Sequence, residues 1–207
     1  MKRIVLLALL ALALPMAVFA DSSMMDFGNL SGTLTGSSSG MTLTANLTSV
    51  YGLPGVGLVQ GADLGTISWS LTGPLSVSTM MNGGTISGVG STFTITSNNP
   101  QLPAGTLFTG SFTGPVQWIL NHPAKGVNEY VLSGQVSGTL YNGVKVTGVS
   151  YEVVVSGSKG LFGGKSTVGS GDMFVVSSVP EPGTLALLGT GLVGLAGTLR
   201  RTLKNKS

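Results

Sequence analysis

The segment "LSGQVSGTLYNGVKVTGVSYEVVV", residues 132–155, carries the clearest structural signal in the chain. Up to its centre, apolar residues and glycine recur at every second position, which is the period of a β-strand with one face on a core. This set consists of Tyr130, Leu132, Gly134, Val136, Gly138 and Leu140. The dipeptide Asn142-Gly143 follows, and it is typical of a type I′ turn, in which both central residues have positive φ. The segment therefore predicts a β-hairpin.

The second half of this hairpin changes parity. Val144 and Val146 share one parity, and a second apolar set lies on the other: Val149, Tyr151, Val153 and Val155. Because one extra residue moves every following side chain to the opposite face, this change predicts a β-bulge at Gly148. The bulge would keep the second set on the core side.

Alternation of the same kind occurs in residues 66–72 and 92–96, and Asn82-Gly83-Gly84 predicts a second hairpin turn. No window between residues 21 and 178 has the period of an amphipathic helix. Many short strands without helices indicate an all-β domain, and we expect an antiparallel β-sandwich or jelly-roll-like fold over residues 21–178.

The first twenty residues have the composition of a secretory signal peptide. Lys2 and Arg3 precede an apolar run, and Ala20 provides the small residue that signal peptidase accepts before its cleavage site. We therefore expect residues 1–20 to form a signal peptide helix and signal peptidase to be a partner. Cleavage between Ala20 and Asp21 would release the mature N-terminus.

The charge and cysteine content of the segment between the two ends exclude some functions. Acidic residues outnumber the lysines there, so the segment lacks the clustered basic surface that a nucleic-acid partner requires. The chain has 0 cysteines, and no disulfide can stabilise an exported domain. Its core and its strand pairing must do so alone.

The C-terminal segment, residues 179–207, has three parts. Pro180, Glu181 and Pro182 predict an extended stretch, because each proline fixes φ and disfavours helix. Residues 184–199 carry no charge and predict a transmembrane helix, a little short of a ~30 Å hydrocarbon core. Arg200 and Arg201 begin a basic tail, residues 200–207, which the positive-inside rule places in the cytoplasm.

This order of parts resembles the PEP-CTERM sorting signal of exported bacterial proteins. The resemblance covers Val179–Arg201 and the signal peptide, but not the central domain. It implies that a membrane protease, exosortase, recognises Pro180, Glu181 and Pro182, and that a membrane-anchored precursor becomes a cell-surface or extracellular protein. It also brings exopolysaccharide into consideration as a partner. A permanent C-terminal anchor is the alternative, and it leaves the triplet unexplained.

The middle of the chain offers few residues for catalysis. His122 is the single histidine and is expected in an exposed loop, while Glu129 and Glu152 fall near the ends of the predicted hairpin, where a carboxylate pair would suit a glycosidase. We interpret the two glutamates as charges on the solvent side of strands, which limit edge pairing. We expect no enzyme activity, no catalytic residue, no cofactor and no metal site.

Binding functions remain open from the sequence. Trp69 and Trp118 have the parity of core residues, whereas the tyrosines are candidates for stacking on sugars: Tyr51, Tyr130, Tyr141 and Tyr151. Tyr141, beside the predicted turn, is the first of these. Threonines alternate in three phrases, a pattern that some ice-binding proteins use: Thr33/Thr35, Thr42/Thr44 and Thr92/Thr94/Thr96. We expect an envelope or extracellular matrix protein of structural or adhesive type, with carbohydrate-binding, ice-binding or hydrolase modules as alternatives.

Overall fold

A computed structural model describes residues 23–75, 81–124, 127–157 and 165–177. Within Ser23–Ser178, which is one compact unit, the chain forms antiparallel strands joined by turns. The strands are β1 (Met24–Ser37), β2 (Gly40–Tyr51), β3 (Val59–Thr72), β4 (Gly84–Ile86), β5 (Thr92–Ser97), β6 (Gly105–Phe112), β7 (Val116–Ala124), β8 (Val127–Leu140), β9 (Lys145–Gly157) and β10 (Lys165–Ser177). The all-β expectation is confirmed for these residues.

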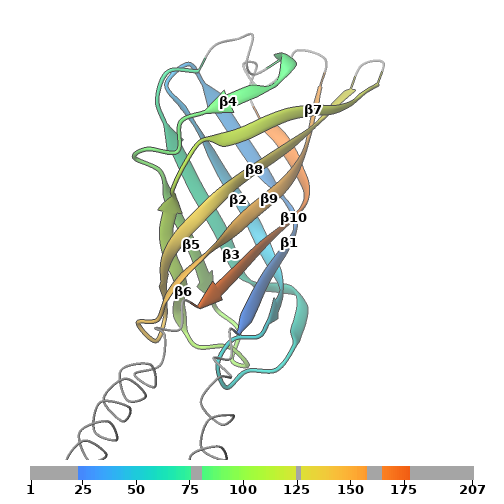
Figure 1. Cartoon of the computed structure of the whole chain (residues 1–207). Coiled ribbons are helices and arrows are strands. Elements are labelled where there is room, and N and C mark those ends of the chain that lie inside the picture. Colours follow the sequence, from blue (N-terminus) through green and yellow to red (C-terminus); the bar gives the residue numbers. More distant parts are fainter. Residues whose placement is uncertain (1–22, 76–80, 125–126, 158–164, 178–207) are drawn as a thin grey trace, which may run out of the picture. The chain divides into compact units, whose positions relative to one another are not determined.

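The sheet closes on itself to form an eight-stranded barrel (Figure 1). Its strands follow the order β8-β6-β5-β3-β2-β1-β10-β9, and β9 pairs again with β8. Strand β8 is long enough to have two partners on one side: residues 136–140 pair with β6, and residues 127–133 pair with β7. Strand β4 pairs with the other edge of β7, and these two strands lie outside the ring of eight strands that forms the barrel.

The expected sandwich or jelly roll is not confirmed, because the wall is one continuous sheet. A barrel and a sandwich both bury one face of every strand, so their strands have the same alternation of apolar and polar residues. A barrel differs from a sandwich in that all its strands form one closed ring, in which the first and last strands of the chain can pair. Here β1 and β10 pair from Met24↔Val176 to Thr35↔Lys165, and closure leaves the eight strands without a free edge between them.

The predicted hairpin joins β8 and β9, but its turn differs from the expectation. Of Asn142 and Gly143, only Gly143 has positive φ, at 84°. The Gly143 amide donates to the Leu140 carbonyl at 2.9 Å, and the Leu140 amide donates to the Val144 carbonyl at 2.9 Å. This is a three-residue loop with glycine in its left-handed position, instead of a two-residue type I′ turn.

The predicted β-bulge at Gly148 is wrong. Strand β9 pairs with β8 without interruption from Lys145 to Gly157, so no residue is inserted. The inner side of β9 therefore keeps one parity, with Val146, Ser150, Glu152 and Val154 buried. The apolar set that we expected on the core faces outward, with Val149, Tyr151 and Val155 exposed. Valine and tyrosine are favoured in strands on either face, so parity alone misled the sequence interpretation.

The interior is filled by large side chains that pack over glycines. Phe93 contacts Phe108 and Phe112 edge to face, with ring centroids 5.8 and 5.7 Å apart. The ring of Phe108 covers the paired glycines Gly110 and Gly138, where an added Cβ would lie 2.7 and 2.6 Å from ring atoms. The glycines of the β8 repeat thus make room for phenylalanines, in agreement with their predicted inward parity.

We expect Gly138→Ala to destabilise the barrel by at least about 2 kcal/mol, because the new methyl group overlaps the Phe108 ring and the Thr109 carbonyl. Urea unfolding followed by tryptophan fluorescence measures this difference. The control is Gly114→Ala, since no atom lies within 4 Å of an added Cβ at that position. Equal stability of the two variants would show that the packing over Gly138 is loose.

Candidate functional site

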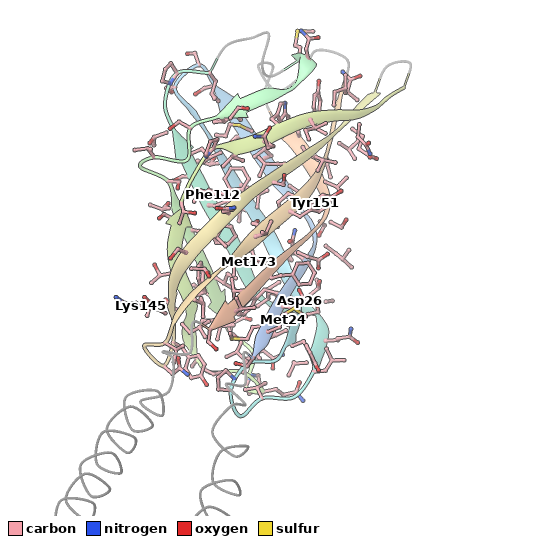
Figure 2. The ribbon with its side chains drawn as sticks, in the orientation of Figure 1. Met24, Asp26, Phe112, Lys145, Tyr151 and Met173 are labelled. Atoms are coloured by element: carbon pink, nitrogen blue, oxygen red, sulfur yellow. The ribbon has the colours of Figure 1, made fainter. Side chains whose placement is uncertain are left out.

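Three aromatic side chains lie beside two carboxylates on the outer surface of β2, β1, β10 and β9. Two of these residues, Asp26 and Tyr151, are labelled in Figure 2. Asp26 on β1 is paired with Tyr51 on β2 and with Phe174 on β10, and Asp172 on β10 is paired with Tyr151 on β9. These aromatic residues are 54% (Tyr51), 41% (Phe174) and 41% (Tyr151) exposed. We call these five residues the aromatic face. Strand pairing alone brings them together from both ends of the barrel sequence.

The two carboxylates of the aromatic face are poorly solvated. Burial raises the pKa of Asp26, and the negative charge of Asp172 raises it further. Burial also raises the pKa of Asp172. The Oδ1 atom of Asp26 is buried and has no hydrogen-bond partner. A buried acceptor without a donor costs free energy, so the Asp26 carboxylate is held at this position at some cost to stability.

The opposite, inner side of the same strands carries a polar pair. Asn29 on β1, Gly171 on β10 and Glu152 on β9 form one row across the sheet. The Asn29 Nδ2 donates to Glu152 Oε2 at 3.1 Å. The two side chains meet above Gly171, which lies between them in the row and has no side chain of its own. A Cβ at Gly171 would overlap Glu152 Oε2 and lie 2.7 Å from Asn29 Oδ1. Glycine is therefore required for this contact.

Glu152 is 1% exposed, and burial raises its pKa to about 8. The hydrogen bond from Asn29 acts in the opposite direction, and the charge of Asp172 adds to the increase. Asn29 Oδ1 in this row is buried without a hydrogen-bond partner, and so is Oγ of Ser150, the neighbouring inward residue on β9. At neutral pH the folded chain therefore holds Glu152 mainly as the neutral acid, which is the form that costs less to bury.

The two glutamates considered for a glycosidase are not assembled as a carboxylate pair. Glu129 is paired with Val155 and accepts a hydrogen bond from Asn121 Nδ2 at 3.0 Å, whereas Glu152 is inside the barrel. The interpretation of Glu152 as a solvent-side charge is wrong for this reason. His122 lies in strand β7, opposite Glu129 in the register, and not in a loop.

The aromatic candidates separate into core and surface. Trp69 and Trp118 are buried as predicted, and Trp118 stacks on Tyr130 with ring centroids 4.7 Å apart. Tyr130 is also buried, and its hydroxyl donates to the Met81 carbonyl at 2.8 Å. Tyr141 is exposed, but its hydroxyl donates to the Pro54 carbonyl at 2.9 Å. Of the predicted tyrosines, Tyr51 and Tyr151 belong to the aromatic face.

The threonine phrases lie side by side on the outer surface of neighbouring strands. Two rows cross the sheet, Thr94-Ser68-Thr44-Thr33 and Thr92-Ser70-Thr42-Thr35. Hydroxyls within the second row bond to one another, at 2.5 Å between Thr35 and Thr42 and 2.7 Å between Ser70 and Thr92. Three residues of this row, Thr35, Thr42 and Ser70, line a depression of about 290 Å³, so the surface is not flat there. Ice binding stays a prediction.

Several other predictions concern residues outside the described part of the chain. The signal peptide with its cleavage site Ala20/Asp21, the triplet Pro180–Pro182 and the predicted helix 184–199 with Arg200 and Arg201 all lie outside the described residues. Within the described part of the chain, no helix is long and apolar enough to cross a membrane. The same part holds no cluster of three or more His, Cys, Asp or Glu side chains suited to a metal ion.

Comparison with known proteins identifies the C-terminal segment. The family model described as the PEP-CTERM protein-sorting motif matches residues 178–201. The chain carries a PEP-CTERM sorting motif. This motif implies an exported protein that an exosortase processes at the membrane. No curated protein and no solved structure matches the chain.

Sequence reasoning missed the aromatic face as a unit. Phe174 and Asp26 were not singled out, and Asp172 was not connected with any tyrosine. The available signal was weak: an aromatic residue beside or near a carboxylate in segments that pair only in the closed barrel. Knowledge of the β1–β10 pairing would have placed Asp26 next to Phe174.

Proposed function

We propose that this chain is an exported protein of the bacterial envelope or extracellular matrix, structural or adhesive in type and not an enzyme. The match of residues 178–201 to the PEP-CTERM motif carries the proposal, because this motif is a signal for sorting and processing. A secretory signal peptide, predicted for residues 1–20, is the companion that export requires.

The barrel supports a structural or adhesive role in two ways. Its interior is occupied by bulky side chains, such as Trp118, Tyr130 and Phe108, which are all fully buried. Its outer surface exposes apolar and aromatic residues in a cluster, and exposed apolar clusters of this kind typically mark interaction sites. A barrel that presents an interaction surface on the outside of its sheet suits an adhesive role.

The same geometry argues against a hydrolase. The two glutamates that a glycosidase mechanism would need are separated by the barrel wall, with Glu152 inside and Glu129 held by Asn121. We propose that processing proceeds through a membrane-anchored precursor, with helix 184–199 in the membrane, followed by release to the surface or the medium.

Cell fractionation tests the proposal. We expect immunoblots of a bacterium that contains an exosortase to show a full-length precursor in the membrane and a shorter form at the surface or in the medium. The control lacks residues 2–20, and should remain in the cytoplasm because no signal peptide directs export. Retention of the intact chain in the cytoplasm would contradict the proposal.

A further inference from the structure

The aromatic face has the composition of a surface that recognises sugars. Tyr51, Phe174 and Tyr151 present large apolar surfaces, and the apolar side chains of Met24, Val149 and Val176 border them. The C–H faces of a pyranose ring pack on such surfaces, and the polar ends of tyrosine side chains remain free for hydrogen bonds. Such a ligand would cover apolar area that is now exposed to water.

The carboxylates add a requirement for hydrogen-bond donors. Asp26 stands between Tyr51 and Phe174 in one row, and Asp172 stands beside Tyr151 in the next. Asp26 Oδ1 is buried, but the residue as a whole is only partly buried, and a sugar hydroxyl can donate to the carboxylate from its exposed side. Hydrogen bonds from a neutral donor to a carboxylate are among the stronger ones in proteins, so the gain is largest where the acceptor has already lost its water.

Charge decides between a sugar and other partners. The rows Tyr51-Asp26-Phe174-Val149 and Ser49-Gly28-Asp172-Tyr151 contain no lysine or arginine. A second copy of the chain, joined through the same face by a twofold axis, would bring its own Asp26 and Asp172 against these carboxylates. Polyuronates and anionic lipids would meet the same repulsion. A neutral glycan supplies apolar faces and hydroxyl donors without added negative charge.

From this geometry we propose that the aromatic face binds a neutral polysaccharide, with the rings of Tyr51, Phe174 and Tyr151 as stacking platforms and Asp26 and Asp172 as hydroxyl acceptors. The inference rests on the proposed adhesive role, for which it names the chemical class of partner. It also explains why five residues from four different strands combine exposed rings with poorly solvated carboxylates.

Affinity electrophoresis of the purified full chain tests this inference. The gels contain dextran, a galactomannan or a soluble cellulose derivative as neutral polymers, and alginate as a polyuronate. We expect retardation by at least one neutral polymer and none by alginate. Tyr151→Ser and Phe174→Ser should each weaken binding about tenfold, because each removes one stacking surface. The control is Val89→Ser, which also replaces an apolar side chain with serine, at a residue that is 81% exposed and lies outside the face.

Each result has a defined meaning. Absence of retardation by every neutral polymer, or binding that Tyr151→Ser and Phe174→Ser both leave unchanged, would overturn the inference. So would a dimer that these two variants dissociate, since the face would then belong to a second copy. An exported chain that binds no glycan overturns the inference and leaves the proposed function standing. A chain that binds glycans but is retained in the cytoplasm overturns the proposed function instead.

Discussion

Glu152→Gln is expected to make the barrel more stable at pH 8 and to remove most of the pH dependence of its unfolding between pH 5 and 8. In the folded chain, burial raises the pKa of Glu152 from its ordinary 4.5 to about 8. Below pH 4.5 the carboxyl is protonated in both the folded and the unfolded chain, and its contribution does not change with pH. Between 4.5 and 8 the unfolded chain loses the proton while the folded chain keeps it. The stability contributed by this group is therefore lost as the pH rises.

The size of the effect follows from the difference between the two pKa values. Each unit corresponds to about 1.4 kcal/mol, so the loss in the wild-type chain reaches on the order of 4 kcal/mol near pH 8. Glutamine has the shape of the neutral acid and keeps an oxygen to accept the hydrogen bond from Asn29, but it cannot ionise. The variant should equal the wild-type chain to within about 1 kcal/mol at pH 4.

Chemical unfolding of the full chain at several pH values measures both curves. The control is Asp63→Asn, an exposed carboxylate outside the polar pair, which should leave the wild-type slope unchanged. Some dependence should remain in Glu152→Gln, because the pKa values of Asp26 and Asp172 are also raised. Parallel curves for the wild-type chain and Glu152→Gln would show that Glu152 is not a buried acid in solution.

The contact between Glu152 and Asn29 also shows where sequence reasoning ends. The two residues are 123 positions apart, and they meet only because β1 and β9 both pair with β10. Alternation identified strands β3, β5, β8 and β9 and the burial of Trp69 and Trp118, and the dipeptide Asn142-Gly143 identified the hairpin, because these depend on local pattern. Which strands become neighbours depends on closure of the whole sheet, and no local pattern records it.

The error at Gly148 has the same origin. Local pattern placed Val149 and Tyr151 on the core, since an apolar set normally faces inward. The structure places Ser150 and Glu152 inside instead, where Glu152 finds Asn29 from another part of the chain. The outward position of Tyr151 then creates the aromatic face. The unpredicted polar pair thus goes together with the wrong parity of β9 and with the outward position of one of the five residues of the aromatic face.

Replacement of Pro180, Glu181 and Pro182 by three alanines is expected to abolish C-terminal processing. The triplet lies within the matched sorting motif, residues 178–201. Recognition by a membrane protease requires an extended and accessible segment, and two prolines enforce that conformation, whereas three alanines favour helix and would let the predicted helix 184–199 continue through the site. Insertion should be unaffected, because the uncharged segment and the basic tail are unchanged. The uncleaved precursor should accumulate in the membrane fraction.

Intact-mass analysis of the mature protein, together with fractionation, distinguishes processing from simple anchoring. In the wild-type chain we expect a C-terminus near the triplet, without residues 185–207. The matched control replaces Asn205 and Ser207, which lie outside the matched motif, with alanine and keeps the triplet, the uncharged segment and the basic residues, so it should be processed normally. A simple membrane anchor needs only an apolar helix and the basic end, and it would treat the wild-type and triple-alanine chains alike. A wild-type product that still carries residues 185–207 would therefore leave only the anchor, because the prolines and the carboxylate would then have no part in the fate of the chain.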